Sequence, residues 1–215
     1  QVLMFKRTIK ETSLEHDIYA TFMAKPMANE PGSAMHIHQS IVDAKTGQNL
    51  FAHPETGEPT PAFFHFIAGQ QKYMPAITSL LAPYVNSYRR LAKGSGAPVN
   101  TQWGYDNRTA GLRVPPSDPA NRRLENRLPS SDANPYLAIA AVLASGYLGM
   151  LEKMSPADPV DQDAATLPQG DLPYSLVQAI IKLERSQPII DILGPQFVTA
   201  YSRVKLHEYE TFMQT

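Results

Sequence analysis

The sequence contains no cysteine. This absence excludes a disulfide-stabilised scaffold, a zinc site built on thiolates and a cysteine nucleophile, and it agrees with a reducing, cytoplasmic setting. Charge is also scarce, because 18% of the residues are charged against roughly 25% in an average domain. Part of the surface is therefore expected to contact something other than water. With a net charge of -1 and no basic run, nothing favours a nucleic-acid or membrane partner.

The hydrophobic stretch of residues 136–151 carries no charge and invites comparison with a membrane span. It is shorter than the roughly 20 residues of a membrane-spanning helix, and it contains Ser145, Gly146 and Gly149. Asn134 and Pro135 directly before it are typical of a helix start. The stretch therefore predicts a buried helix rather than a membrane span.

Proline, by contrast, is abundant, with 19 residues in a chain of 215, about twice the average usage of about 5%. This abundance argues against a coiled coil or a simple bundle. Apolar periodicity predicts helices at residues 1–17, 61–74, 136–151, 174–186 and 195–213, and strands at residues 19–23, 34–41, 111–114 and 123–128. Pro75 is expected to kink or end its helix, and residues 93–100 and 158–170 are expected to be loops. The irregular alternation of strands and helices indicates an α+β fold.

The densest polar pattern in an apolar strand is Arg123-Leu-Glu-Asn-Arg-Leu128. Because side chains alternate along a strand, Arg123, Glu125 and Arg127 share one face. Two guanidinium groups beside one carboxylate can neutralise a phosphate or carboxylate and leave an oxygen ligand for a hard cation. A ladder of salt bridges across the strands explains the motif equally well.

The strand motif His36-Ile-His38 places two imidazoles and Ser40 on one face. Without cysteine or a neighbouring acid this motif favours structural histidines over a zinc site. Further arginines lie near the glycine-rich loop and the third strand, at positions 89, 90, 108 and 113. Together these groups predict a site for a polyanion such as a nucleotide with its metal ions, held by side chains because no Walker phosphate loop is present.

Five motifs resemble one known family in their order and spacing. They are Gly32-Ser-Ala-Met-His-Ile-His-Gln-Ser40, Asn86-Ser-Tyr-Arg-Arg-Leu91, Asp106-Asn-Arg-Thr109 before Arg113-Val-Pro115, Arg122-Arg-Leu-Glu-Asn-Arg127 and Ala133-Asn-Pro-Tyr-Leu-Ala138. Residues 1–155 resemble the C-terminal part of the glutamine synthetase catalytic domain, and the resemblance is looser over 156–215. It implies an antiparallel curved sheet with flanking helices, with 156–215 as a helical segment of the same domain. An N-terminal β-grasp domain and the first part of the catalytic domain would lie upstream of this chain.

The resemblance implies an ATP-dependent ligase that phosphorylates the γ-carboxylate of glutamate and then joins it to an amine. Mg2+ or Mn2+ would be the metal cofactor, with the remaining metal ligands upstream. The roles carried over by motif position are metal binding by His36 and Glu125, ATP binding by His38, Ser40, Arg108, Arg113 and Arg123, glutamate binding by Gly32, Arg90, Arg108 and Arg127, and catalysis by Arg90 and Arg108. The family also implies a dodecamer of two stacked rings with active sites between neighbouring subunits.

Two departures from the family pattern bear on the substrate. Gly96 stands where glutamine synthetase has the loop glutamate that closes the site and helps deprotonate ammonium, and Pro31 replaces an asparagine. Losing the acid while keeping the phosphoryl-transfer residues favours an alkyl amine, and the sequence is most similar to the γ-glutamylputrescine and γ-glutamylpolyamine synthetases. Glutamine synthesis from ammonia, glutamylation of another amine and a non-catalytic binding role remain the alternatives.

Overall fold

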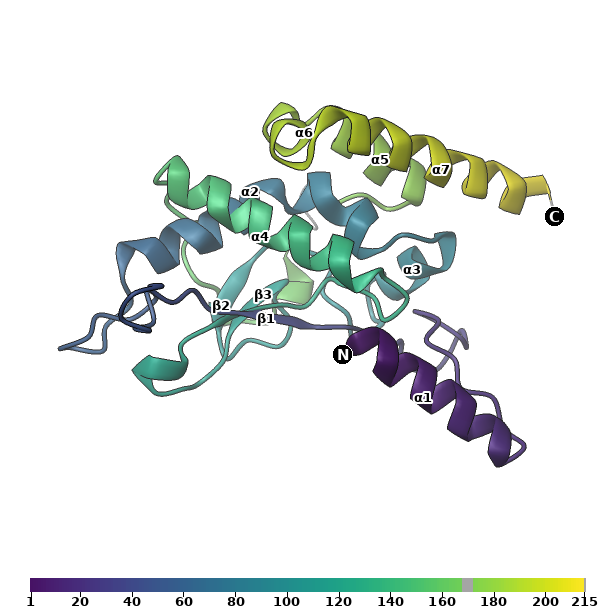
Figure 1. Ribbon diagram of the computed structural model, residues 1–215, viewed down its shortest axis with the longest axis horizontal. Helices are drawn as coiled ribbons and strands as arrows, with labels where there is room; N and C mark the ends of the chain where they lie inside the picture. Colours follow the sequence, from purple (N-terminus) through teal and green to yellow (C-terminus); the bar gives the residue numbers. More distant parts are fainter. Residues whose placement is uncertain (168–171, 215) are drawn as a thin grey trace.

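The computed structural model describes residues 1–167 and 172–214. The helices of this part of the chain are α1 Val2–Glu15, α2 Pro61–Leu81, α3 Val85–Arg90, α4 Pro135–Leu151, α5 Leu176–Glu184, α6 Gln187–Leu193 and α7 Pro195–Gln214, and the strands are β1 Ile37–Gln39, β2 Trp103–Tyr105, β3 Leu112–Val114 and β4 Leu124–Asn126. Figure 1 shows α2 and α4 crossing over the sheet, with α5 to α7 as an outer layer and α1 projecting from the body. The α+β prediction is confirmed, and no described helix is long and apolar enough to cross a membrane.

The four strands form one sheet in the order β1-β4-β3-β2. β4 pairs antiparallel with β1 and with β3, whereas β2 pairs parallel with β3, so the expected antiparallel sheet is mixed at this edge. Parallel neighbours normally need a crossover of a dozen or more residues. Here β2 and β3 have three residues each, so the short loop 106–111 is enough to bring the chain back to the start of a parallel neighbour. The loop begins at Asp106, which has a φ of 47°.

The core lies between the sheet and the α2–α4 layer. It includes the fully buried side chains of Phe63, Phe66, Ile67, Leu112 and Leu124. Each of the two helices begins at a capped residue: the Thr60 side chain accepts from the Phe63 N–H, and the Asn134 side chain accepts from the Tyr136 N–H. Such caps satisfy amide groups that have no partner within the helix.

The contact between α2 and α4 is close enough to require glycine. A Cβ added at Gly149 would lie 2.2 Å from the His65 carbonyl oxygen and 2.5 Å from Gly69 Cα. The backbones of the two helices therefore touch directly, which fixes α4 across the sheet.

Three helix predictions are corrected by the structure. α2 continues through Pro75 to Leu81, because its packing against α4 and α5 outweighs the roughly 3 kcal/mol cost of an internal proline. The helix predicted at 174–186 ends at Glu184, and α6 follows at once, with Pro188 in its first turn. α4 is buried on one face only, since Ile139, Leu143 and Tyr147 are exposed.

The strand predicted at 19–23 is irregular chain, because side chains rather than a neighbouring strand satisfy its backbone. Ser131 Oγ donates to the Phe22 carbonyl at 2.7 Å, and the Ala20 N–H donates to Ser13 Oγ at 3.2 Å. The strand predicted at 34–41 is shortened to β1. The loop predicted at 158–170 is irregular to 167, except for a 3-10 turn at Ala164–Thr166, and its last residues lie outside the described part.

Candidate active site

The candidate site is organised around the Glu125 carboxylate in the middle of β4. Its Oε1 accepts from Arg127 Nη1 at 2.8 Å and lies 2.9 Å from His36 Nδ1, and its Oε2 accepts from Arg113 Nη1 at 2.7 Å. These donors come from three neighbouring segments, the β1 entry, β3 and the β4 exit. Alternation along the strand predicted that Arg123, Glu125 and Arg127 share one face. Of these three, Glu125 and Arg127 are in direct contact.

The Glu125 side chain is 3% exposed, and its charge is set by these partners. Burial alone would raise its pKa, but the hydrogen bonds from His36 and Arg113 and the charge of Arg127 lower the pKa to about 2. Glu125 is therefore ionised at neutral pH. It lies between the guanidinium groups of Arg113 and Arg127. The salt bridges considered from the sequence are present, between Glu125 and Arg113 and between Glu125 and Arg127.

His38 and Arg123 lie beside this cluster. His38 pairs with Glu125 in the β1–β4 register, and its Nε2 is 3.9 Å from Glu125 Oε1. Arg123 Nε lies 3.3 Å from His38 Nδ1. Burial lowers the pKa of His38 despite the neighbouring carboxylate, so the neutral ring can accept the Arg123 hydrogen bond.

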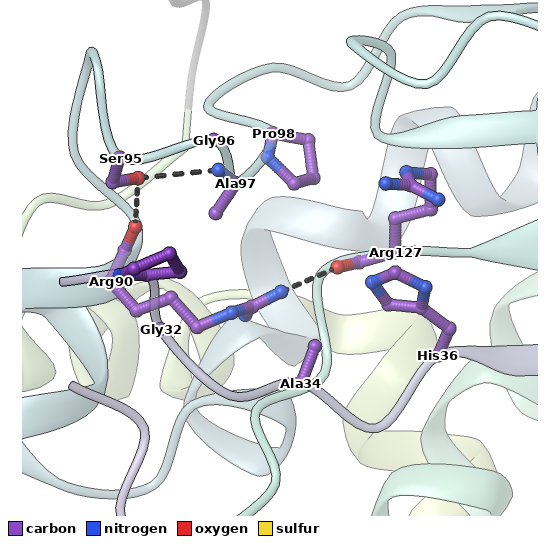
Figure 2. Close-up of a pocket in the computed structure, with 10 residues that line it drawn as sticks. Gly32, Ala34, His36, Arg90, Ser95, Gly96, Ala97, Pro98 and Arg127 are labelled. Atoms are coloured by element: carbon purple, nitrogen blue, oxygen red, sulfur yellow. Dashed lines mark hydrogen bonds between the residues drawn. The ribbon is translucent and has the colours of Figure 1, made fainter. Parts of the chain in front are cut away.

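A cavity of about 220 Å³ opens next to the cluster. Figure 2 shows Arg90, Arg127 and His36 on one side and the loop residues Ser95 to Pro98 on the other. Arg127 Nε is buried and has no hydrogen-bond partner within the described structure. A buried guanidinium N–H without an acceptor is costly, and the positive charge of Arg127 beside the cavity favours an anionic ligand.

Arg90 is 3% exposed, and it shapes the cavity more than it reaches into it. Its Nη1 donates to the Leu128 carbonyl at 2.7 Å and its Nη2 to the Arg127 carbonyl at 2.9 Å. Burial, partly offset by Asp132, lowers the pKa of Arg90 to about 10. Gly32 leaves room for this side chain, because a Cβ there would lie 2.9 Å from Arg90 Cγ.

The predicted residues are thus brought together in large part. Gly32, His36, Arg90 and Arg127 line the cavity, and the remaining members of the cluster are His38, Arg113, Arg123 and Glu125. Arg108 and Ser40 are exposed and are not among the residues that line the cavity. Arg108 lies on the loop from β2 to β3, and Ser40 follows β1.

Sequence reasoning gave no role to Asp106, which the structure places in the cluster. Its Oδ1 accepts from Arg113 Nε at 3.0 Å and also from Nη2 of the same guanidinium. Asp106 therefore fixes the arginine that holds Glu125. No local pattern marked this contact, because Asp106 follows β2, a strand that the sequence patterns did not predict.

The residues present fit a divalent cation in part. Within the described structure no group of three or more acidic or histidine side chains could hold a metal, but His36 and Glu125 form a pair of suitable ligands. Mg2+ characteristically takes one or two protein ligands and completes its shell with water and phosphate oxygens. The pair matches that partial donor set, with the hydrogen bond between His36 and Glu125 giving way to the ion.

Residues 1–215 match the family model described as glutamine synthetase, catalytic domain. The chain therefore belongs to the glutamine synthetase family. It is 36% identical over 221 residues to a glutamine synthetase of Pyrococcus abyssi, an alignment that covers 99% of this chain and 49% of the relative. The chain spans about half the length of the curated relatives it matches.

Other members of the family that are similar to this chain act on other amines. A glutamate–isopropylamine ligase of a Pseudomonas species is 38% identical over 96% of this chain and 46% of its own. The gamma-glutamylputrescine synthetase PuuA of Escherichia coli is 36% identical over 98% of this chain and 44% of its own. The solved structure titled "Apo GmaS without ligand" superposes with a TM-score of 0.86 at 31% identity, covering 99% of this chain and 49% of that one. The predicted family and fold are confirmed, and the named relatives are all ligases.

Proposed function

We propose that the protein containing this chain joins the γ-carboxylate of glutamate to an amine at the expense of ATP. A carboxylate oxygen attacks the γ-phosphorus, ADP leaves, and the amine nitrogen then attacks the acyl carbon while phosphate leaves and the amine loses a proton. The observation that carries this proposal is the guanidinium of Arg127, which lines the cavity next to the Glu125 cluster and keeps one buried N–H without a partner in the described structure. An anionic substrate needs such a donor, because two anions must approach each other for phosphoryl transfer.

The residues of the chain support this chemistry mainly by holding charge in position. Arg127 donates to the substrate carboxylate, Arg90 holds the backbone that carries Arg127, and His36 and Glu125 would contribute two ligands to a divalent ion. Such an ion would neutralise charge on the phosphates when bound. His38, Arg113 and Arg123 would face ATP, and exposed Arg108 and Ser40 would join them only when the substrates bind.

We propose a polyamine such as putrescine as the amine. The loop side of the cavity is formed by Gly96, Ala97 and Pro98, so it offers no acid to bind ammonium and leaves room for an alkyl chain. The similarity to the putrescine and isopropylamine enzymes supports this choice. Ammonia is the second candidate, supported by the archaeal glutamine synthetases.

The test is phosphate release by the full-length protein with ATP, Mg2+, glutamate and one amine at a time. We expect putrescine or spermidine to give the highest kcat/KM, above isopropylamine and ammonium. Turnover with ammonium at lower concentrations than any polyamine would reject the polyamine assignment. Absence of phosphate release with every amine would reject the ligase proposal for this protein.

A substitution in the loop tests whether Gly96 sets the preference for the amine. Gly96→Glu restores an acid at the cavity, and we expect it to shift preference toward ammonium by about 10-fold in relative kcat/KM, about 1.4 kcal/mol. Gly94→Glu is the matched control, because Gly94 and Gly96 have similar φ angles of 79° and 75° and only Gly96 lines the cavity. Equal shifts in both variants would contradict a specific role of Gly96.

The resemblance extends the proposal to a dodecamer with active sites between neighbouring subunits. Exposed apolar side chains on α1 and α4 support an assembly, namely Leu3, Met4, Phe5, Ile139, Leu143 and Tyr147. Surface of this kind is usually covered by protein.

A further inference from the structure

A second hollow, the aromatic pocket, lies on the other side of the sheet from Glu125. It has a volume of about 540 Å³ and is formed by the start of α2, by β2 and by the segment 154–159. Trp103 and Tyr105 of β2 pair with Leu112 and Val114, which face the core, whereas Arg113 between them faces Glu125. A ligand in the aromatic pocket therefore would not occupy the candidate active site.

Three aromatic rings form its wall. The ring centroids of Phe64 and Trp103 are 6.1 Å apart, those of Trp103 and Tyr105 are 5.4 Å apart, and both pairs are edge to face. In an edge-to-face pair the positive edge of one ring lies against the face of the other, and aromatic faces carry negative potential. Tyr105 is 46% exposed, so part of its surface remains available to a ligand.

Two ring N–H groups of the pocket already donate to backbone carbonyls. His65 Nδ1 lies 2.6 Å from the Met154 carbonyl and carries the hydrogen of this bond, because a carbonyl oxygen only accepts. The indole N–H of Trp103 is already used, because it donates to the Ala157 carbonyl at 2.6 Å. These two donors are therefore occupied within the protein and are not free to bind an anion.

The charge of the lining has one sign. Asp158 lines the pocket, and no lysine or arginine is found among the described residues that line it. Glu58 and Arg122 lie outside the lining, and their charges act on the Tyr105 hydroxyl in opposite directions. A cation is therefore complementary to the pocket, and an anion is not.

We propose that the aromatic pocket binds a small organic ammonium ion, with its charge against Asp158 and the faces of Tyr105 and Phe64. Aromatic faces within about 6 Å attract such cations, and the attraction is stronger where water is excluded. The volume is in the usual range of about 300–1,000 Å³ for small-molecule sites. The proposal does not rest on the ligase activity.

Trp103, the single tryptophan of the chain, reports on binding at this place. The full-length protein is titrated with phenethylamine and, at equal ionic strength, with its neutral analogue 2-phenylethanol. We expect a saturable change in tryptophan emission with the amine, at least several-fold tighter than with the alcohol, that is lost in Trp103→Phe. No saturable change, or equal affinity for the neutral analogue, would overturn the proposal.

Variants separate this pocket from other amine sites. Asp158→Asn and Tyr105→Leu are expected to weaken calorimetric binding of phenethylamine several-fold each, whereas Asp161→Asn, an exposed acid outside the lining, leaves it unchanged. Trp103→Phe keeps an aromatic face and is expected to retain calorimetric binding while losing the fluorescence change. Unchanged affinity in both Asp158→Asn and Tyr105→Leu would place binding elsewhere and reject the site.

Discussion

At the scale of single residues, the site depends on one buried anion held by donors from separate segments. Glu125 is fixed by His36, Arg113 and Arg127, and Arg113 is fixed in turn by Asp106. A buried carboxylate is tolerated only because each of its oxygens is paired. Fixing one carboxylate in this way also fixes the direction of the arginines around it, which is what a site for anions requires.

Replacing Arg127 separates substrate binding from folding. Arg127→Ala removes the unpartnered Nε donor but leaves Glu125 its bonds to Arg113 and His36. We expect glutamate-dependent phosphate release to fall by about 100-fold or more, with the midpoint of thermal unfolding lowered by only a few degrees. Arg203→Ala, an exposed position on α7, is the control. Retained activity in Arg127→Ala would remove the proposed carboxylate contact.

Acid stability should depend on Glu125. Its pKa is lowered from 4.5 to about 2 on folding, so between these pH values the unfolded chain binds more protons and acid favours unfolding. The stabilisation is complete above about pH 4.5 and is lost as the pH falls through about 2, and it amounts to about 3 kcal/mol.

The measurement is denaturant unfolding at several pH values in this window. Glu125→Gln should lower stability at neutral pH and should flatten the pH dependence relative to the wild type. Glu184→Gln, at an exposed glutamate of α5, serves as the control and should keep the wild-type slope. An unchanged slope in Glu125→Gln would show that other carboxylates dominate acid unfolding.

At the scale of elements, the α2–α4 contact holds the sheet that carries the site. Gly149→Ala would bring a Cβ within 2.2 Å of the His65 carbonyl, so the helices must separate. We expect a loss of about 2 kcal/mol or more in the free energy of unfolding, although alanine gains roughly 1 kcal/mol in a helix interior.

Chemical denaturation checks this prediction, with Ala140→Ser on the exposed side of α4 as the matched control. The control should change stability by no more than about 0.5 kcal/mol. A Gly149→Ala variant as stable as the wild type would mean that the two helices can move apart at no cost.

At the scale of the whole molecule, the sequence predicts the positions of α1, α4, α7, β3 and β4 well, because their periodicity is local, whereas it does not predict the short helices α3 and α6. Alternation along β4 predicted that Glu125 and Arg127 share one face, and their hydrogen bond agrees with this prediction. The parallel edge strand, the continuation of α2 past Pro75 and the irregular course of 19–23 depend on contacts between distant segments. Local patterns carry no information on such contacts, and for the same reason they gave Asp106 no role.

The outer face of α4 leads to a prediction about assembly. Ile139, Leu143 and Tyr147 follow one another at helical spacing, and they are 42%, 42% and 52% exposed. An apolar stripe of this kind on a stable protein is normally covered. We expect Leu143→Glu in the full-length protein to lower the mass of the assembly in light scattering, because a buried carboxylate would lack a partner there. Lys45→Glu, on an exposed turn, should keep the wild-type mass. An assembly of unchanged mass and stability in Leu143→Glu would show that this face stays in water.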